Sequence, residues 1–119
     1  MTKTSNPIVD KTFEFAGNIL DLNSRLMEQK QYVLAKQVAR SGTSIGANVR
    51  ESQRAVSKAD FINKLGIALK EADETQYWLE LIEKKIFKID SKLKIELNEI
   101  ISLLVAIINS SKKNLKQPF

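Results

Sequence analysis

Apolar residues recur along most of this chain at spacings of three and four, the period of an α-helix packed on one side. The longest such pattern lies in the second half of the chain, where inward positions alternate between both spacings: Phe61, Leu65, Ala68, Ala72, Thr75, Leu79, Ile82 and Ile86. A seam of this length is typical of a helix that packs lengthwise against other helices. No segment shows a convincing strand pattern.

Helix start and stop signals divide the chain into four predicted helices. Asn6 before Pro7 is a favourable start, because asparagine caps free N–H groups and proline is preorganised at the first helical position. Ser57 and Asp60 form a variant of the capping box. We predict helices over residues 7–28, 33–55, 58–87 and 91–115. Four long helices with short connections predict one all-α domain, residues 1–119, folded as an antiparallel up-down-up-down four-helix bundle.

The middle of the second predicted helix departs from an ordinary packed helix. It keeps the apolar period, yet Gly42 and Gly46 stand mid-helix, where each costs about 1 kcal/mol relative to alanine. Ser44, Asn48 and Glu51 lie close to the packed face. A chain retains such residues for close helix contacts, a polar network or a binding site, so this segment indicates a particular bundle and not a particular reaction.

A group of polar residues is predicted near the core of the second and third helices: Ser44, Asn48, Glu51, Glu71 and Glu74. Paired carboxylates could serve acid–base chemistry or bind a metal. The structural interpretation is favoured, because glutamates beside Arg40, Ser44 and Asn48 can satisfy one another's hydrogen bonds and fix which helices pair.

The outward side of the second helix is basic. At about 100° per residue, four cations fall within about 40° of one line, opposite the apolar face: Lys36, Arg40, Arg50 and Arg54. Lys58 and Lys64 continue this basic stripe past the next turn. Such a stripe is the geometry of a surface that contacts nucleic-acid phosphates. Arg40 could instead be held by a neighbouring carboxylate.

The predicted apolar surface is wider than one bundle core needs, which favours self-association. We assign six residues outside the main stripes to an oligomer interface: Ile8, Phe15, Leu22, Tyr77, Trp78 and Leu81. The alternative is that these residues widen the core of a single chain. Tyr77 and Trp78 could also stack on nucleic-acid bases, although interface packing is favoured.

Composition narrows the classes of function. The chain has no cysteine and no histidine, which excludes thiol nucleophiles, imidazole bases and ordinary zinc sites. We therefore predict no catalytic residue, no metal site and no cofactor. The net charge of +5 favours an anionic partner such as nucleic acid. The first residues do not form a secretion signal, and the longest apolar run is too short to span a bilayer, so we expect a cytoplasmic protein.

The second helix carries a distinctive pattern, Leu34-x-x-Gln37-x-x-Arg40-Ser41-x-x-Ser44-Ile45-x-Ala47-Asn48-x-x-Glu51, which Phe61, Ala68, Glu71, Glu74 and Leu79 continue. This pattern resembles the signature of the 23S rRNA intervening-sequence proteins, a bacterial family of four-helix bundles. The family usually has proline where Gly46 stands and glycine where Ser52 stands. The accessory proteins of diversity-generating retroelements are similar. Those accessory proteins form pentameric barrels and bind nucleic acid together with a reverse transcriptase. The resemblance implies a homopentamer and nucleic-acid binding, and it implies no known catalytic activity.

We therefore expect a non-enzymatic, homo-oligomeric bundle that binds RNA or DNA through basic surface helices. The expected partners are further copies of the chain, RNA or DNA, and a reverse transcriptase or another protein, with no membrane. The alternative is a protein-binding scaffold or accessory subunit whose basic charge is incidental. A carboxylate-based hydrolase using Glu51 or Glu71 is a third hypothesis, and metal-dependent turnover would distinguish it.

Overall fold

The structure is a computed structural model that describes residues 6–115. It contains four α-helices: α1 (Pro7–Glu28), α2 (Tyr32–Ser52), α3 (Lys58–Lys85) and α4 (Ser91–Leu115). No strand occurs among the described residues. The prediction of an all-α chain with four helices is confirmed.

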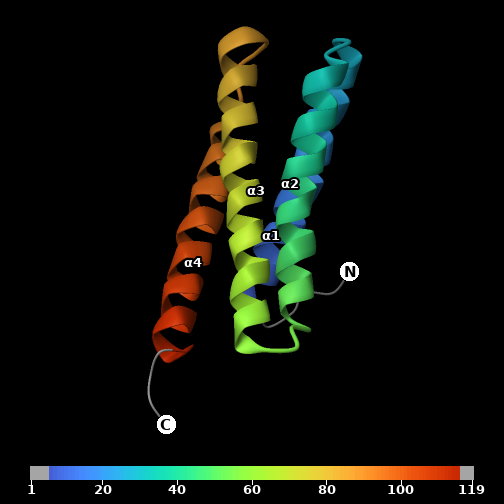
Figure 1. Cartoon of the computed structure of the whole chain (residues 1–119). Coiled ribbons are helices and arrows are strands. Elements are labelled where there is room, and N and C mark those ends of the chain that lie inside the picture. The colour runs from blue at the N-terminus through green and yellow to red at the C-terminus, as the bar shows by residue number, and fades with distance from the viewer. Residues whose placement is uncertain (1–5, 116–119) are drawn as a thin grey trace.

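The four helices lie side by side along one long axis (Figure 1). Each helix packs against its neighbours in the chain, and α4 also contacts α1, although this contact is the least extensive. The residues that flank α1 and α2 meet: Asn6 Nδ2 donates to Gln53 Oε1 at 2.9 Å. Nearer their other ends, Asn23 Nδ2 donates to the carbonyl of Ala35 at 2.9 Å. This packing is compatible with the predicted bundle.

The two predicted helix starts have the expected caps. The Asn6 side chain accepts from the N–H of Ile8 at 3.2 Å, and Pro7 is the first residue of α1. At the start of α3, Ser57 Oγ accepts from the N–H of Asp60 at 3.0 Å. The Asp60 carboxylate in turn accepts from the N–H of Val56 at 3.2 Å. The bonds from Ile8 and Asp60 occupy N–H groups that have no partner within their helices.

The second helix ends earlier than predicted. It stops at Ser52, and the N–H groups of Gln53, Arg54 and Ala55 donate to carbonyls only three residues back. This tighter pattern turns the chain toward α3 instead of extending the helix to residue 55. The third helix likewise ends at Lys85, slightly before the predicted residue 87.

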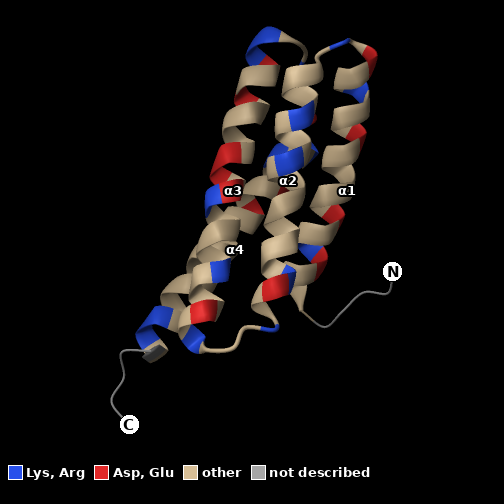
Figure 2. Cartoon of the chain, turned by 45° about the vertical axis from the view of Figure 1, so that its right-hand side comes forward, with Lys and Arg blue, Asp and Glu red and all other residues tan. Residues whose placement is uncertain are grey.

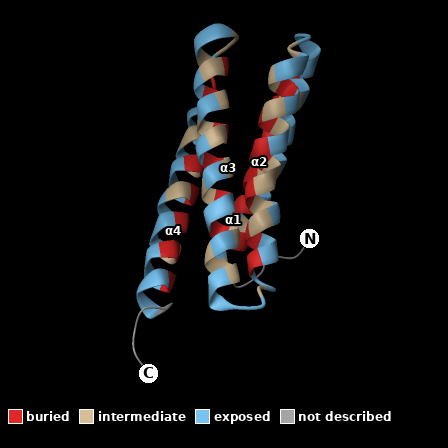
Figure 3. Cartoon of the chain, in the orientation of Figure 1, coloured by how far each residue is buried: buried red, intermediate tan, exposed pale blue. Residues whose placement is uncertain are grey.

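Side chains from all four helices fill the space between them (Figure 3). The centre of the seam predicted on the third helix is buried in α3: Leu65, Ala68, Ala72, Thr75, Leu79 and Ile82. This seam is therefore the side by which α3 packs into the bundle.

On α1 the structure corrects the predicted oligomer row. Ile8, Phe15 and Leu22 are 3%, 0% and 5% exposed and belong to the core of the single chain. The large apolar side chains that remain about half exposed on α1 are Phe13, Leu20 and Met27. The reason is that α1 carries two apolar rows at seven-residue spacing, and its neighbours α2 and α4 cover only one of them.

The glycines of α2 mark a close approach to α1. A Cβ on Gly42 would lie 2.8 Å from two carbons of the Ile19 side chain. A Cβ on Gly46 would lie 3.2 Å from the carbonyl oxygen of Thr12. Of the three explanations considered for these residues, close helix contact is the one the structure supports.

Candidate nucleic-acid interface

The six predicted basic residues lie on the outside of the bundle. Lys36, Arg40, Arg50, Arg54 and Lys58 are exposed, and Lys64 is half-buried. In Figure 2, however, basic and acidic segments are interspersed along the helices. The carboxylates near each cation therefore decide how much positive charge the stripe presents.

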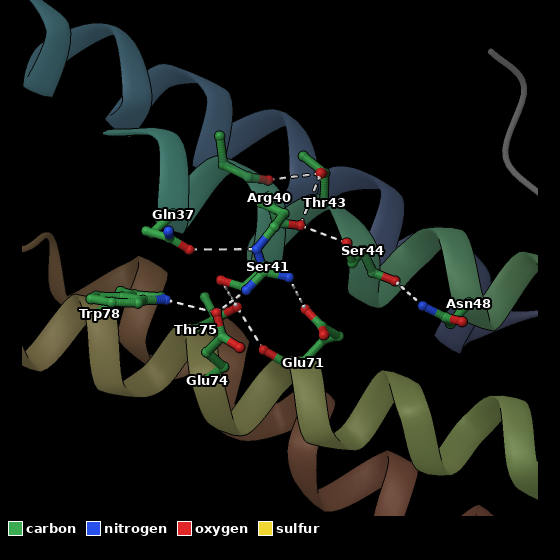
Figure 4. Close-up of polar contacts among 11 residues, drawn as sticks. Gln37, Arg40, Ser41, Thr43, Ser44, Asn48, Glu71, Glu74, Thr75 and Trp78 are labelled. Carbon is green, nitrogen blue, oxygen red and sulfur yellow. Dashed lines mark hydrogen bonds and ion pairs between the residues drawn. The ribbon is translucent and has the colours of Figure 1, made fainter. Parts of the chain in front are cut away.

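Arg40 is held by two glutamates of α3 (Figure 4). Its Nη1 donates to Glu71 Oε2 at 3.1 Å, and its Nη2 contacts Glu74 Oε2. The indole N–H of Trp78 donates to the same oxygen of Glu74 at 2.9 Å. We call these four residues the Arg40 clamp. The alternative considered for Arg40, that a neighbouring carboxylate holds it, is confirmed.

The clamp shifts the acidity of its members. The Trp78 hydrogen bond lowers the pKa of Glu74 below its ordinary value, and Arg40 lowers it further. The hydrogen bond to Glu74 raises the pKa of Arg40. Both groups therefore stay charged at neutral pH. One guanidinium faces two carboxylates, so the centre of the basic stripe presents no surplus positive charge.

The predicted polar cluster is not one network. Ser44 Oγ donates to the carbonyl of Arg40 at 2.6 Å, and Asn48 Nδ2 donates to the carbonyl of Ser44 at 2.9 Å. Short polar side chains on a helix often bond to the carbonyl four residues back in this way. Glu51 is exposed and pairs with Lys64 at 3.2 Å. The expectation that these residues bond to Glu71 and Glu74 was wrong, because nearer partners satisfy them.

A buried polar pair beneath the clamp was not singled out from the sequence. Thr75 Oγ1 lies 2.9 Å from Ser41 Oγ and 2.8 Å from the carbonyl of Glu71. Each hydroxyl can both donate and accept, so both contacts can be hydrogen bonds at once. Ser41 and Thr75 are both fully buried. The sequence feature that could have indicated this pair is that Ser41 and Thr75 each occupy an inward position among apolar residues of their helix.

The cations outside the clamp have varied surroundings. The Arg50 guanidinium lies 5.4 Å from the centre of the Phe13 ring on α1. The ammonium of Lys58 lies 5.6 Å from the centre of the Phe61 ring. Lys36 and Arg54 are exposed. Cations in such positions can contact phosphates while their hydrocarbon stems rest on the protein.

Comparison with known proteins identifies the family. The family model described as 23S rRNA-intervening sequence protein matches residues 4–110. The chain belongs to the 23S rRNA-intervening sequence protein family. A solved structure from Bacteroides thetaiotaomicron VPI-5482, described as a protein with unknown function from the S23 ribosomal protein family, is 51% identical with a TM-score of 0.81. The match covers 85% of this chain and 97% of that one. A search of curated proteins found no significant match.

Membership of the 23S rRNA-intervening sequence protein family confirms the resemblance inferred from the sequence pattern. The residues of that pattern have definite places in this family member. Arg40, Glu71 and Glu74 form the clamp, and Ser44 and Asn48 bond along their own helix. Three of the apolar positions are buried in the core: Ile45, Ala68 and Leu79. The conspicuous polar part of the pattern is therefore largely accounted for by contacts within one chain.

Three predicted interface residues of this family member lie on α3. Tyr77 is 57% exposed, and its ring stands edge-on to Trp78 with centres 5.0 Å apart. Trp78 and Leu81 are half-buried. Tyr77 is therefore the more accessible of the two rings, and the indole N–H of Trp78 donates to Glu74. Their role in an oligomer interface remains a prediction.

Neither a metal cluster nor a membrane span occurs in the described part of the chain. Residues 6–115 contain no group of three or more acidic side chains placed to hold a metal ion. None of the helices described is long and apolar enough to cross a membrane.

Proposed function

We propose that the chain is a non-enzymatic, homo-oligomeric four-helix bundle that binds RNA or DNA through basic surface helices. The observation that carries the proposal is the set of exposed cations outside the Arg40 clamp, among them Lys36, Arg54 and Lys58. The net charge of +5 supports it, since counterion release from phosphates drives such binding. The family name connects relatives of this chain with rRNA genes.

The proposal includes an antiparallel up-down-up-down order and assembly into a homopentamer in the cytoplasm. The antiparallel order is supported by the bond from Asn6 to Gln53 and the bond from Asn23 to Ala35. Self-association is supported by large apolar side chains that one chain leaves exposed: Phe13, Leu20, Met27, Tyr77, Ile95 and Val105. Repeating a few weak phosphate contacts around an oligomer would raise avidity, provided that one strand reaches several subunits.

The assembly is tested by light scattering on the purified protein. We expect a mass near five times the 13.5 kDa of the chain. A dimer or tetramer would contradict the pentamer, and a monomer at micromolar concentration would contradict self-association altogether.

Nucleic-acid binding is tested by fluorescence anisotropy with labelled single- and double-stranded RNA and DNA probes. We expect binding at about 50 mM salt, with log affinity falling linearly against log salt concentration. We also expect little dependence on sequence, because phosphate contacts carry no sequence information. No binding at this salt concentration would contradict the proposal, because exposed charges attract most strongly at low ionic strength.

The second candidate function is a protein-binding scaffold or an accessory subunit of a reverse transcriptase or another protein. The exposed row of Phe13, Leu20 and Met27 favours it, because contiguous exposed apolar side chains mark interaction surfaces. A protein that shows no affinity for any nucleic-acid probe yet elutes with a protein partner would favour this function.

A further inference from the structure

Some cations of the basic stripe are paired with carboxylates, and others are not. Arg40 is bound to Glu71 and Glu74, and Lys64 is bound to Glu51. Arg54 and Lys58 flank the turn between α2 and α3, and both are exposed. The stripe therefore gathers two exposed cations at this end of the bundle, whereas Lys36 lies near the opposite end of α2.

The tertiary structure brings two further cations to that end. Lys112 and Lys113 lie in the last turn of α4 and are exposed. The end of α4 and the turn between α2 and α3 lie at the same end of the bundle in Figures 1 and 2. The contacts between α3 and α4 agree with this placement, because the partners run in opposite directions: Glu83 with Lys94 and Gln76 with Asn98.

Two carboxylates near this end, those of Asp60 and Glu51, have partners other than these cations. Asp60 accepts from the backbone N–H of Val56 as part of the cap of α3. Glu51 is paired with Lys64. Within the described residues, no ion pair joins a carboxylate to any of four cations: Arg54, Lys58, Lys112 and Lys113. We call these four residues the basic end.

We infer that the basic end is the surface that contacts the phosphate backbone of nucleic acid. The inference rests on the proposed function and locates its site. It assigns phosphate contact to Lys112 and Lys113, which do not belong to the predicted stripe. It assigns no phosphate contact to Arg40 and Lys64, because glutamates hold them. Exposed ammonium and guanidinium groups attract phosphodiesters without reading bases. The basic end should therefore bind many sequences alike.

The test compares two pairs of lysines with the same chemistry at opposite ends of the bundle. K112Q/K113Q removes two cations from the last turn of α4. K84Q/K85Q removes two exposed lysines from the last turn of α3. Both variants lower the net charge equally and both remove favourable charges from a helix C-terminus. A difference between them therefore reports position and not total charge. Thermal unfolding by circular dichroism confirms that both variants fold.

We expect K112Q/K113Q to weaken binding of a labelled duplex or single strand at about 50 mM salt by roughly tenfold or more. The salt slope should shrink by about one for each phosphate that the variant no longer neutralises. R54Q/K58Q should show the same behaviour, and K84Q/K85Q should bind like the parent protein.

Three results would count against these expectations, and they show which part is wrong. If the parent binds but K112Q/K113Q and R54Q/K58Q bind equally well, the basic end is not the contact surface, while the proposed function stands. The same holds if K84Q/K85Q is weakened as much as the other pairs. If the parent binds no probe, the proposed function itself is wrong and this inference is wrong with it.

Discussion

The two sides of α2 are held by different means. On the side of α1, small residues let the helices approach until Gly42 meets the Ile19 side chain. On the side of α3, polar groups meet: the Arg40 clamp at the surface and the pair of Ser41 and Thr75 beneath it. The contact of α2 with α1 depends on side-chain volume, whereas the contact of α2 with α3 depends on which polar groups face each other.

This difference matters for how the bundle is specified. Apolar contacts between helices tolerate some sliding, because dispersion has no direction. Hydrogen bonds have strict distances and angles, so they fix the register of α3 on α2. We infer that α1 supplies close packing to α2, whereas α3 supplies register, and four predictions test this contrast.

The largest effect is expected for Ile19→Ala. Ile19 is fully buried against α2, and truncating a buried isoleucine typically lowers the free energy of unfolding by about 2–5 kcal/mol. Chemical denaturation measures the loss. The neighbouring variant Leu20→Ala is the control, because Leu20 is 52% exposed and should cost far less. Equal losses of unfolding free energy for the two variants would contradict the finding that α1 buries Ile19 and exposes Leu20.

The next effect is expected for the buried hydroxyl pair. Thr75→Val keeps the shape of the side chain but leaves the Ser41 hydroxyl without this partner, at a cost of about 1–3 kcal/mol. The double variant Ser41→Ala/Thr75→Val should recover part of the loss, since no buried hydroxyl then lacks its partner. Denaturant melts of the two variants and the parent decide the matter. A single variant as stable as the parent would show that the pair does not hold α3 on α2.

A smaller effect is expected for Gly42→Ala, which should destabilise the parent protein but stabilise the Ile19→Ala variant. The new Cβ would crowd Ile19, and overpacking typically costs about 1–3 kcal/mol, partly offset by the better helix propensity of alanine. In the Ile19→Ala background the same change should stabilise the protein, because the space is then free. Gly66→Ala is the control, since nothing lies within 4 Å of its Cβ position. It should stabilise α3 by roughly 1 kcal/mol at most.

The smallest effect concerns pH and the Arg40 clamp. The pKa of Glu74 is lowered first by the Trp78 hydrogen bond and then by Arg40. A lowered pKa in the folded state contributes stability above the ordinary pKa of glutamate, about 4.3. That contribution is lost as the pH falls from this value through the folded-state pKa.

NMR titration of the Glu74 carboxyl group tests this assignment. Trp78→Phe keeps an aromatic ring and removes the indole N–H, so the pKa of Glu74 should rise toward its ordinary value. Glu83, whose pKa is lowered mainly by the Lys94 hydrogen bond, is the internal control and should not move. An unchanged pKa for Glu74 in Trp78→Phe would contradict the role given to Trp78.

Local sequence signals were sufficient to predict the four helices, the capping of α1 and α3, and the buried seam of α3. Helical period, proline and capping residues act within a few positions of one another, so no distant partner is needed to recognise them. The seam on α3 was readable because only one side of that helix repeats at heptad spacing. The midpoint of α2 was also recognisable as unusual, since two glycines inside a packed helix need a reason.

The choice of which apolar row of α1 is buried required the packed bundle, because Phe13 and Phe15 each belong to a row with helical period. The position of α3 was needed to show that the exposed Arg40 side chain is paired with two glutamates. The packed bundle was also needed to bring together Lys112, in the last turn of α4, and Lys58, at the start of α3. These residues lie far apart in the chain but at the same end of the bundle. Periodicity shows that a side of a helix will be covered, whereas the partner that covers it depends on how distant segments pack.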